Sequence, residues 1–293
     1  MIDEITLENT ILNKQIKLSK SDYKSDIVLE SVDFGTVEAT HKTYKGINQI
    51  GETLQGTSIG TREVSIVGWI IGEDDAYLEK IRREFNSFVN PLQGIKILYK
   101  DYLIDMIADS SIKYSTSEEE NNEVMCKFMI QGTCVNPMFY DKEQNKISIA
   151  NIEKKFMFPL ILKPEGIQLG IRQPSLFTTI INKGNIETGF ELVFKALGTV
   201  VNPSLTNVVT QEYLKINKTM VAGEEIRINS NDGEKTIYGY LNGVKSNYYR
   251  YKDYGSTWLR LAIGENIFRY NAEENISSLE VTISFSNKYF EVQ

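Results

Sequence analysis

The sequence predicts a mainly β protein with two domains and one long α-helix. Residues 60–99 have the pattern of a strand, a helix and a second strand. From residue 156 onward, short β-branched and aromatic stretches recur with Gly, Asn and Asp between them, which favours an all-β domain. The 293 residues suit one large or two medium-sized domains. A polar stretch at 138–155 marks the boundary, so we predict domains at 1–150 and 151–293.

The strand Arg62–Ile71 and the helix after it have the clearest sequence signals. The strand is rich in β-branched and aromatic residues. Asp74 suits the N-cap, because its carboxylate can accept from free backbone N–H groups of the first turn. Four apolar residues then share one helical face: Leu78, Ile81, Phe85 and Phe88. Asn90 precedes a proline and is therefore pushed out of the α region, which predicts a helix over 74–89.

The remaining strands of the first domain follow from the same apolar patterns. They are predicted at Ile2–Leu7, Ile11–Leu18, Ile27–Phe34, Gly94–Tyr99, Tyr102–Ile107, Ile112–Ser115 and Val124–Val135. Residues 46–61 contain four glycines and few large apolar side chains, which is typical of a loop. Such a long loop is usually functional or ordered by a partner. Two alternatives stay open: the loop reaches a neighbouring subunit, or it is a plain mobile connection.

The second domain is predicted to be a β-sandwich or jelly roll. Its strands are expected at Phe156–Leu162, Leu176–Asn182, Gly189–Leu197, Glu212–Ile216, Glu225–Asn229, Lys235–Leu241, Thr257–Ala262 and Ser278–Phe285. The triplet Asn231-Asp232-Gly233 is a strong turn signal between two of these strands. Regular short strands separated by such turns are typical of sandwiches.

Composition excludes several function classes. The net charge of −7 argues against a nucleic-acid groove, which requires a basic surface. No apolar run approaches the roughly 20 residues that span a bilayer. The first ten residues, MIDEITLENT, lack a basic segment followed by an apolar core, so we expect no secretory signal and a soluble protein made in a cytoplasm.

The residues that most often carry chemistry do not form a site. Cys126 and Cys134 lie on one face of a predicted strand, roughly 26 Å apart, too far for a disulfide unless the chain turns between them. His41 is the only histidine, and zinc usually takes four His or Cys ligands. Consecutive acidic residues at Glu118–Glu120 do not converge easily on a cation, so a solvated turn is expected there. We therefore predict no catalytic, cofactor-binding or metal-binding residues.

An aromatic stretch near residue 250 has three interpretations. It contains Tyr248, Tyr249, Tyr251, Tyr254 and Trp258. The tyrosines could shield the edge of the sandwich with the tryptophan in its core, form a protein interface, or stack against a sugar. The sequence alone leaves these three open.

Several segments, in order, resemble the phage distal tail protein family, the siphovirus-type tail component often called Dit. In the first domain they are the glycine-bearing loop, GTREVSIVGWI and FNSFVNPLQGIKILY. In the second domain the most specific motifs are Asn182–Asn185, Asn202-Pro203, Gly223-Glu224 before Ile226–Asn229, and Gly264–Asn266. Residues 247–256 match no motif of that family.

The resemblance implies a fold and a role. The fold is an N-terminal split β-barrel with one helix, in residues 1–150, and a peripheral galectin-like β-sandwich in residues 151–293. The role is that of a structural tail-tip or baseplate hub protein of a phage or phage tail-like particle. A hexameric ring would join the tail tube protein to the tail-associated hub protein, and its outer domain would anchor receptor-binding or side proteins. Such a ring also pairs strand edges that would otherwise aggregate.

Further expectations follow from the same resemblance. The protein would not be an enzyme, would use no cofactor, and would bind no nucleic acid and span no membrane. It would be assembled in the host cytoplasm and would reside in the virion, at the tail tip. The alternative is a carbohydrate-binding module that recognises host surface polysaccharide, although a galectin-like fold does not transfer sugar binding by itself.

Overall fold

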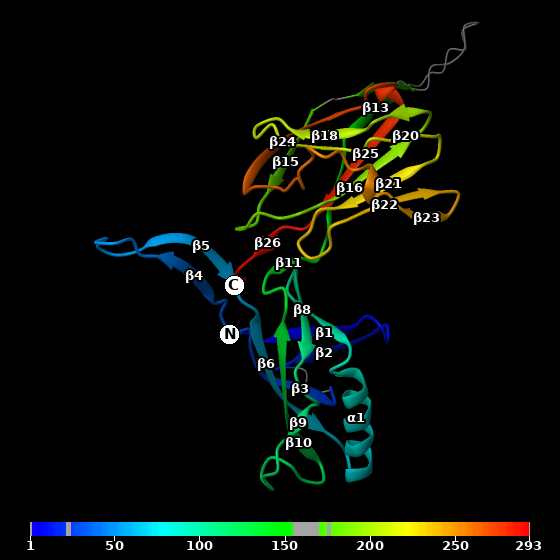
Figure 1. Ribbon diagram of the computed structural model, residues 1–293. Helices are drawn as coiled ribbons and strands as arrows, with labels where there is room; N and C mark the ends of the chain where they lie inside the picture. The colour runs from blue at the N-terminus through cyan, green and yellow to red at the C-terminus, as the bar shows by residue number, and fades with distance from the viewer. Residues whose placement is uncertain (1, 22–24, 155–169, 175–176, 293) are drawn as a thin grey trace, which may run out of the picture. The chain divides into compact units, whose positions relative to one another are not determined.

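The computed structural model describes residues 2–21, 25–154, 170–174 and 177–292, and it is mainly β (Figure 1). The chain forms two compact units. Unit 1 comprises residues 1–142 and 289–293, and unit 2 comprises residues 143–288. The chain therefore passes from unit 1 to unit 2 between residues 142 and 143, and we expected this boundary near residue 150. In the described part of the chain, no helix is both long and apolar enough to span a membrane.

The last residues of the chain differ from the expected domain division, because they return to unit 1. The ring of Tyr289 packs edge-on against Tyr102, with centroids 5.2 Å apart. The backbone carbonyl of Phe290 accepts a hydrogen bond from the guanidinium of Arg62. Neither contact has a local sequence signal, since each joins residues more than a hundred positions apart.

Unit 1 is built on a ten-stranded sheet whose main path runs β2-β1-β7-β8-β10-β6-β3. Its strands are β1 (Glu4–Asn9), β2 (Lys14–Ser19), β3 (Ile27–Asp33), β6 (Arg62–Ile71), β7 (Gly94–Tyr99), β8 (Tyr102–Ala108), β9 (Lys113–Tyr114), β10 (Met125–Cys134), β11 (Phe139–Asp141) and β26 (Lys288–Tyr289). β2 and β3 remain the two ends of the path, so the sheet does not close into a barrel among the described residues. The predicted strands of this domain are confirmed to within a few residues.

The one α-helix of the described residues, α1 (Asp75–Phe88), covers the core of unit 1 as predicted. Asp74 caps it by accepting a hydrogen bond of 2.7 Å from the backbone N–H of Tyr77. The buried residues of the helix are the four expected ones: Leu78, Ile81, Phe85 and Phe88. Phe85 meets Phe128 of β10 edge-to-face, with centroids 5.0 Å apart. Fully burying one such side chain stabilises the fold by about 1.5–3 kcal/mol.

A hairpin occupies the stretch that we predicted as a loop at 46–61. β4 (Ala39–Tyr44) pairs with β5 (Thr53–Ile59) in register from Ala39↔Ile59 to Tyr44↔Thr53. We call residues 39–59 the arm. The loop prediction is wrong for residues 53–59, because Thr, Ser and Gly there give no apolar alternation to read. The backbone ladder forms without that alternation, so only residues 45–52 form the turn.

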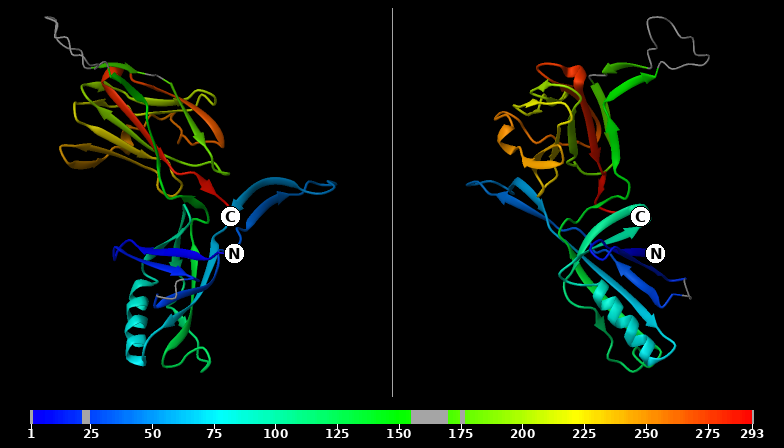
Figure 2. Two further views of the ribbon diagram at one scale, coloured as in Figure 1. Left: turned by 180° about the vertical axis from the view of Figure 1, so that it is seen from behind. Right: turned by 90° about the vertical axis from the view of Figure 1, so that its right-hand side faces the viewer.

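Unit 2 is a β-sandwich, and the predicted fold class is confirmed (Figure 2). One sheet has the order β12-β25-β16-β21-β22-β23 and the other has the order β15-β24-β18-β19. The strands of unit 2 are β12 (Asn145–Ser148), β13 (Ala150–Lys154), β14 (Gly170–Pro174), β15 (Phe177–Asn182), β16 (Glu191–Ala196), β17 (Val200–Val201), β18 (Ser204–Asn207), β19 (Tyr213–Lys215), β20 (Thr219–Met220), β21 (Glu225–Asn229), β22 (Thr236–Leu241), β23 (Val244–Asn247), β24 (Gly264–Asn271) and β25 (Leu279–Phe285). Buried residues of both sheets, among them Phe194 and Phe268, form its core.

Three predictions in this unit have different outcomes. The turn at Asn231-Asp232-Gly233 is confirmed, with Gly233 at φ 76° between β21 and β22. The strand predicted at Thr257–Ala262 is wrong: only Leu261 forms a β-bridge there, with Thr188. The apolar alternation that suggested a strand does reflect burial, because Leu259 and Leu261 are buried. The segment nevertheless has no strand paired with it along its length. The strand predicted at Phe156–Leu162 lies outside the described residues.

Candidate assembly surfaces

The arm is a solvent-exposed hairpin that projects from unit 1 (Figures 1 and 2). Every residue of β4 and of β5 is exposed. The side-chain hydrogen bonds recorded for its described residues stay inside the arm, such as His41 Nδ1 with Thr57 Oγ1 at 3.0 Å and Gln49 Nε2 with Thr53 Oγ1 at 2.9 Å. His41 therefore belongs to an exposed ribbon and has no nucleophile or carboxylate beside it among these contacts.

The tip of the arm presents apolar side chains to solvent. Ile47 is 97% exposed and Ile50 is fully exposed, and Tyr44 and Leu54 are more than half exposed. An isolated two-stranded hairpin is at best marginally stable in water. Exposed apolar side chains gathered at the end of such a ribbon make it a candidate surface for a protein partner. The arm is therefore the strongest candidate interaction element in unit 1.

Arg62 holds the base of the arm and the returning C-terminal segment together. Its side chain is fully buried, with 0% exposed. The guanidinium donates to the carbonyl oxygens of Pro137 at 2.8 Å, Phe34 at 3.1 Å and Gly35 at 3.2 Å, and also to that of Phe290. A guanidinium is planar and carries several donors. When it is buried and bonded to several acceptors, it therefore fixes their positions relative to one another.

The acceptors of Arg62 come from three separate stretches of unit 1, so one side chain sets where the arm begins. Gly35 lies at φ 56°, and an added Cβ would stand 2.5 Å from the carbonyl oxygen of Glu63. Only glycine fits this approach at the start of the arm. Sequence reasoning missed the role of Arg62. The available signal was its position in β6, in phase with the inward-facing Val64 and Ile66.

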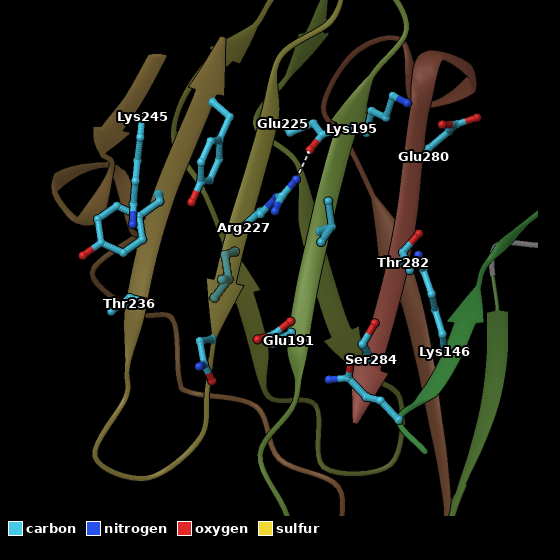
Figure 3. Close-up of a pocket in the computed structure, with 16 residues that line it drawn as sticks. Lys146, Glu191, Lys195, Glu225, Arg227, Thr236, Lys245, Glu280, Thr282 and Ser284 are labelled. Carbon is cyan, nitrogen blue, oxygen red and sulfur yellow. Dashed lines mark hydrogen bonds and ion pairs between the residues drawn. The ribbon is translucent and has the colours of Figure 1, made fainter. Parts of the chain in front are cut away.

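Unit 2 has a broad groove of about 670 Å³ on the outer face of its six-stranded sheet (Figure 3). Charged side chains of both signs and two tyrosines line it. The guanidinium of Arg227 donates to Glu225 at 2.9 Å and lies 4.7 Å from the ring centroid of Tyr240. The ammonium of Lys245 lies 3.8 Å from the ring centroid of Tyr238. A face of this kind offers hydrogen bonds and aromatic surface to a polar partner, and it has no nucleophile activated by a base among these contacts.

The aromatic stretch divides between core and surface. Tyr248, Tyr251 and Trp258 pack partly buried against the sandwich core, so they shield its edge. Tyr249 is half exposed and Tyr254 is fully exposed, which leaves them available to an interface or a sugar. The structure thus supports the shielding interpretation for Tyr248 and Tyr251, whereas Trp258, expected in the core, is only partly buried and lies outside any strand.

A buried carboxylate anchors this edge. Glu224 accepts from the Tyr248 hydroxyl at 2.9 Å and pairs with Lys218 Nζ at 2.8 Å. Burial alone would raise the pKa of Glu224, but hydrogen bonds from Lys218, the Val221 N–H and Tyr248 lower it below its ordinary value. Burial and the neighbouring carboxylate raise the pKa of Tyr248 to about 12. At neutral pH Glu224 is therefore an ionised carboxylate and Tyr248 a neutral phenol, and their hydrogen bond serves to hold the structure together.

The other predicted chemistry-bearing residues are structural. Cys126 and Cys134 are buried free thiols, as expected, and burial raises the pKa of Cys134 to about 12. Glu118 and Glu119 are exposed, but Glu120 differs from the expected solvated turn. It is half-buried, accepts from the Ser115 hydroxyl at 2.8 Å and pairs with Lys127 at 3.2 Å. Across the described ranges, no group of three or more His, Cys, Asp or Glu residues could hold a metal ion.

Comparison with known families covers both units. The model described as phage tail protein RIFT-related domain matches residues 18–159. The model described as siphovirus-type tail component, C-terminal domain, matches residues 183–289.

The chain belongs to the distal tail protein (Dit) family. The two matched segments together span most of this Dit-family chain. The family consists of structural components of phage tails. No protein of curated function matches the chain.

Solved structures of phage tail components show the same fold. The chain is similar to the crystal structure of the Dit protein of phage SPP1, described as a paradigm of the hub adsorption apparatus in phages that infect Gram-positive hosts. The TM-score is 0.67 at 11% identity, over 97% of this chain and 98% of that one. It is also similar to a chain of the activated phage P2 baseplate with Ca, with a TM-score of 0.55 at 11% identity over 97% and 98% of the two chains. The activated phage p2 baseplate with Sr gives a TM-score of 0.54 at 11% identity, over 96% and 97%.

Proposed function

We propose that this Dit-family chain forms a hexameric ring at the tail tip, in which unit 1 of each copy contacts the next copy through its arm. The observation that carries the proposal is the arm itself: an exposed hairpin with apolar side chains at its tip and a base held by a buried arginine. The number six comes from the resemblance to the family and not from the single chain.

A ring follows from the kind of contact that an arm makes. When one patch of a subunit binds a different patch on the next subunit, the contact is heterologous, and it gives a ring when the rotation closes. The ends of the unit 1 sheet, β2 and β3, also have unpaired backbone groups on one side. Pairing or covering such edges in an assembly removes an aggregation hazard.

We infer that the ring joins the tail tube protein on one side to the tail-associated hub protein on the other. Unit 2 would anchor receptor-binding or side proteins, with its groove and the exposed Tyr249 and Tyr254 as the contact surfaces. The assembled protein would reside in the virion and would form in the host cytoplasm. Similarity to chains of a hub adsorption apparatus and of two baseplates supports these roles.

The experiment replaces residues 40–58 with Asn-Gly, because Ala39 and Ile59 are cross-strand partners and a two-residue turn can close that hairpin. Deleting 46–61 instead would strip β4 of its partner. We expect the variant to melt like the wild type and to fail to form rings in sedimentation and negative-stain images, alone or with tube and hub proteins. A matched control replaces only His41 and Thr57 with valine, which keeps the ribbon. Normal rings without the arm would contradict the proposal.

The alternative, a carbohydrate-binding module that recognises host surface polysaccharide, has one supporting observation. The groove of unit 2 presents two tyrosine rings beside charged and hydroxyl side chains, a combination suited to a polar ligand. Titration of the protein with host wall polysaccharide tests it. Saturable heat that disappears in Tyr238→Ala and persists in Tyr254→Ala would support this role, and no heat at any concentration would exclude it.

A further inference from the structure

We propose that the tip of the arm of one copy binds a defined apolar seat on unit 1 of the next copy. The seat is a hollow of about 350 Å³ beside β7 and β8, and Gly94, Ile107 and Val135 are among the residues that line it. The exposed Ile11 and Leu92, which we call its flank, are sequence neighbours of the lining residues Thr10 and Gly94. This inference rests on the proposed ring and names the surface that receives the arm.

The hollow exists because a glycine occupies a strand position. Gly94 of β7 pairs with Ile107 of β8, and an added Cβ at Gly94 would meet no atom within 4 Å. Ile107 and Val135 face outward beside this gap, and Val135 is 68% exposed. The outer face of the sheet therefore has an apolar depression at a site where a side chain would otherwise stand.

A buried asparagine holds the flank of the seat in place. Asn9 Nδ2 donates to the carbonyl of Phe88 and to Gln93 Oε1, both at 2.9 Å. Its Oδ1 accepts from the backbone N–H groups of Ile11 at 3.1 Å and Leu12 at 3.0 Å. These four hydrogen bonds tie the turn after β1 to the loop after α1. The turn carries the exposed Ile11, and the loop carries Leu92, which is 92% exposed.

The hydrogen bonds of Asn9 fix the backbone of the two segments that carry Ile11 and Leu92. A side chain that binds in this seat would find the surrounding backbone already fixed. The seat is therefore pre-organised, which lowers the entropy cost of binding.

The arm tip is the complementary part of the same chain. Ile47 and Ile50 are apolar and exposed, as an apolar hollow requires of its occupant. Asp105, which lines the hollow, already pairs with Lys96 at 3.9 Å, so the match between tip and seat is one of apolar surface. The tip and the seat are different patches of unit 1, so a tip-to-seat contact that the partner does not reciprocate is heterologous, as a ring requires. A reciprocal exchange of arms between two copies would instead close a two-fold dimer.

The test uses single cysteine substitutions mixed in pairs. Ile50→Cys chains are combined with Val135→Cys chains under mild oxidation, with tube and hub proteins present if rings need them. A disulfide requires Cα atoms within about 7 Å, so it reports the contact directly. The native Cys126 and Cys134 are buried and do not compete. Met129→Cys is the matched control, because Met129 lies on the outward face of the same strand, roughly 20 Å away.

We expect a crosslink between the Ile50→Cys and Val135→Cys chains and none to Met129→Cys chains. We also expect Gly94→Leu, which fills the hollow at an unstrained position, and Val135→Asp to weaken ring assembly at least about tenfold, with unchanged melting. Met129→Asp should assemble like the wild type.

The contrary results separate the two proposals. Wild-type rings with no Ile50–Val135 crosslink, or normal rings from Val135→Asp, overturn the seat and leave the ring standing. A crosslink that forms only within a doubly substituted chain shows that the arm folds onto its own unit and also overturns the seat. Wild-type protein that forms no ring with any tail component overturns the ring and the seat together.

Discussion

Replacing Arg62 with methionine is the sharpest test of how unit 1 holds its arm and its C-terminal segment. Methionine keeps an unbranched apolar side chain in the buried position but removes the guanidinium. The carbonyl groups of Phe34, Gly35, Pro137 and Phe290 then lose their shared donor. The ring of Phe139 also loses the cation 4.9 Å from its centroid.

The cost of this substitution follows from competing effects. A hydrogen bond to a charged group contributes about 1.5–3 kcal/mol, but removing a buried charge also relieves its desolvation. The carbonyls at the edge of the cluster can turn to water, so the losses do not add. We expect the free energy of unfolding of unit 1 to fall by about 3 kcal/mol. For a unit of this size that lowers Tm by roughly 6–12 °C.

Differential scanning calorimetry and hydrogen exchange measure the effect. The transition of unit 1 should shift while that of unit 2 stays, and backbone amides of residues 34–38 and 289–292 should exchange faster. Arg83→Met is the control, because its side chain is 81% exposed on α1 and pairs only with Glu79. It should change stability by less than about 0.5 kcal/mol. A shift of Arg62→Met as small as that of the control would refute the clamp.

Two further predictions concern buried groups. The folded protein lowers the pKa of Glu224, so this carboxylate stabilises unit 2 at pH values above its unfolded pKa near 4.5. That stabilisation is lost as the pH falls through the folded pKa. Acid should therefore destabilise wild-type unit 2 more steeply than the Glu224→Gln variant. At pH 7 that variant should be less stable by about 2 kcal/mol, measured by urea unfolding, and parallel pH profiles would contradict the assignment. Burial raises the pKa of both thiols, so Cys126 and Cys134 should resist iodoacetamide at pH 8 until urea unfolds unit 1, and rapid labelling of the native protein would show that the strand opens.

The sequence predicted elements whose side chains alternate or repeat against a core. The helix α1 could be predicted because Asp74, the apolar spacing and Asn90-Pro91 all indicate the same helix. The strand β10 could be predicted because every second residue from Cys126 to Cys134 faces inward. In both cases the local pattern and the burial that it serves coincide.

The sequence did not predict features that depend on distant partners. The arm has no buried face, so β5 has no periodic signal, although its backbone pairs with β4 along its length apart from one register shift at Lys42/Thr43. The segment Thr257–Ala262 alternates like a strand because Leu259 and Leu261 are buried, yet it lacks a continuous neighbour. The role of Arg62 depends on carbonyl groups of Phe34, Pro137 and Phe290, which are far from it in the sequence. The arm was missed because it lacks a buried face, and the other two features were missed because they depend on contacts with distant residues.

An electron-microscopy reconstruction of the isolated tail tip, or of the protein reassembled with tube and hub proteins, tests the proposed role most directly. We predict a closed ring of six copies, with the arm of each copy resting on unit 1 of the next. A single copy per particle, a two-fold dimer, or a ring in which the arms contact no neighbouring copy would contradict it.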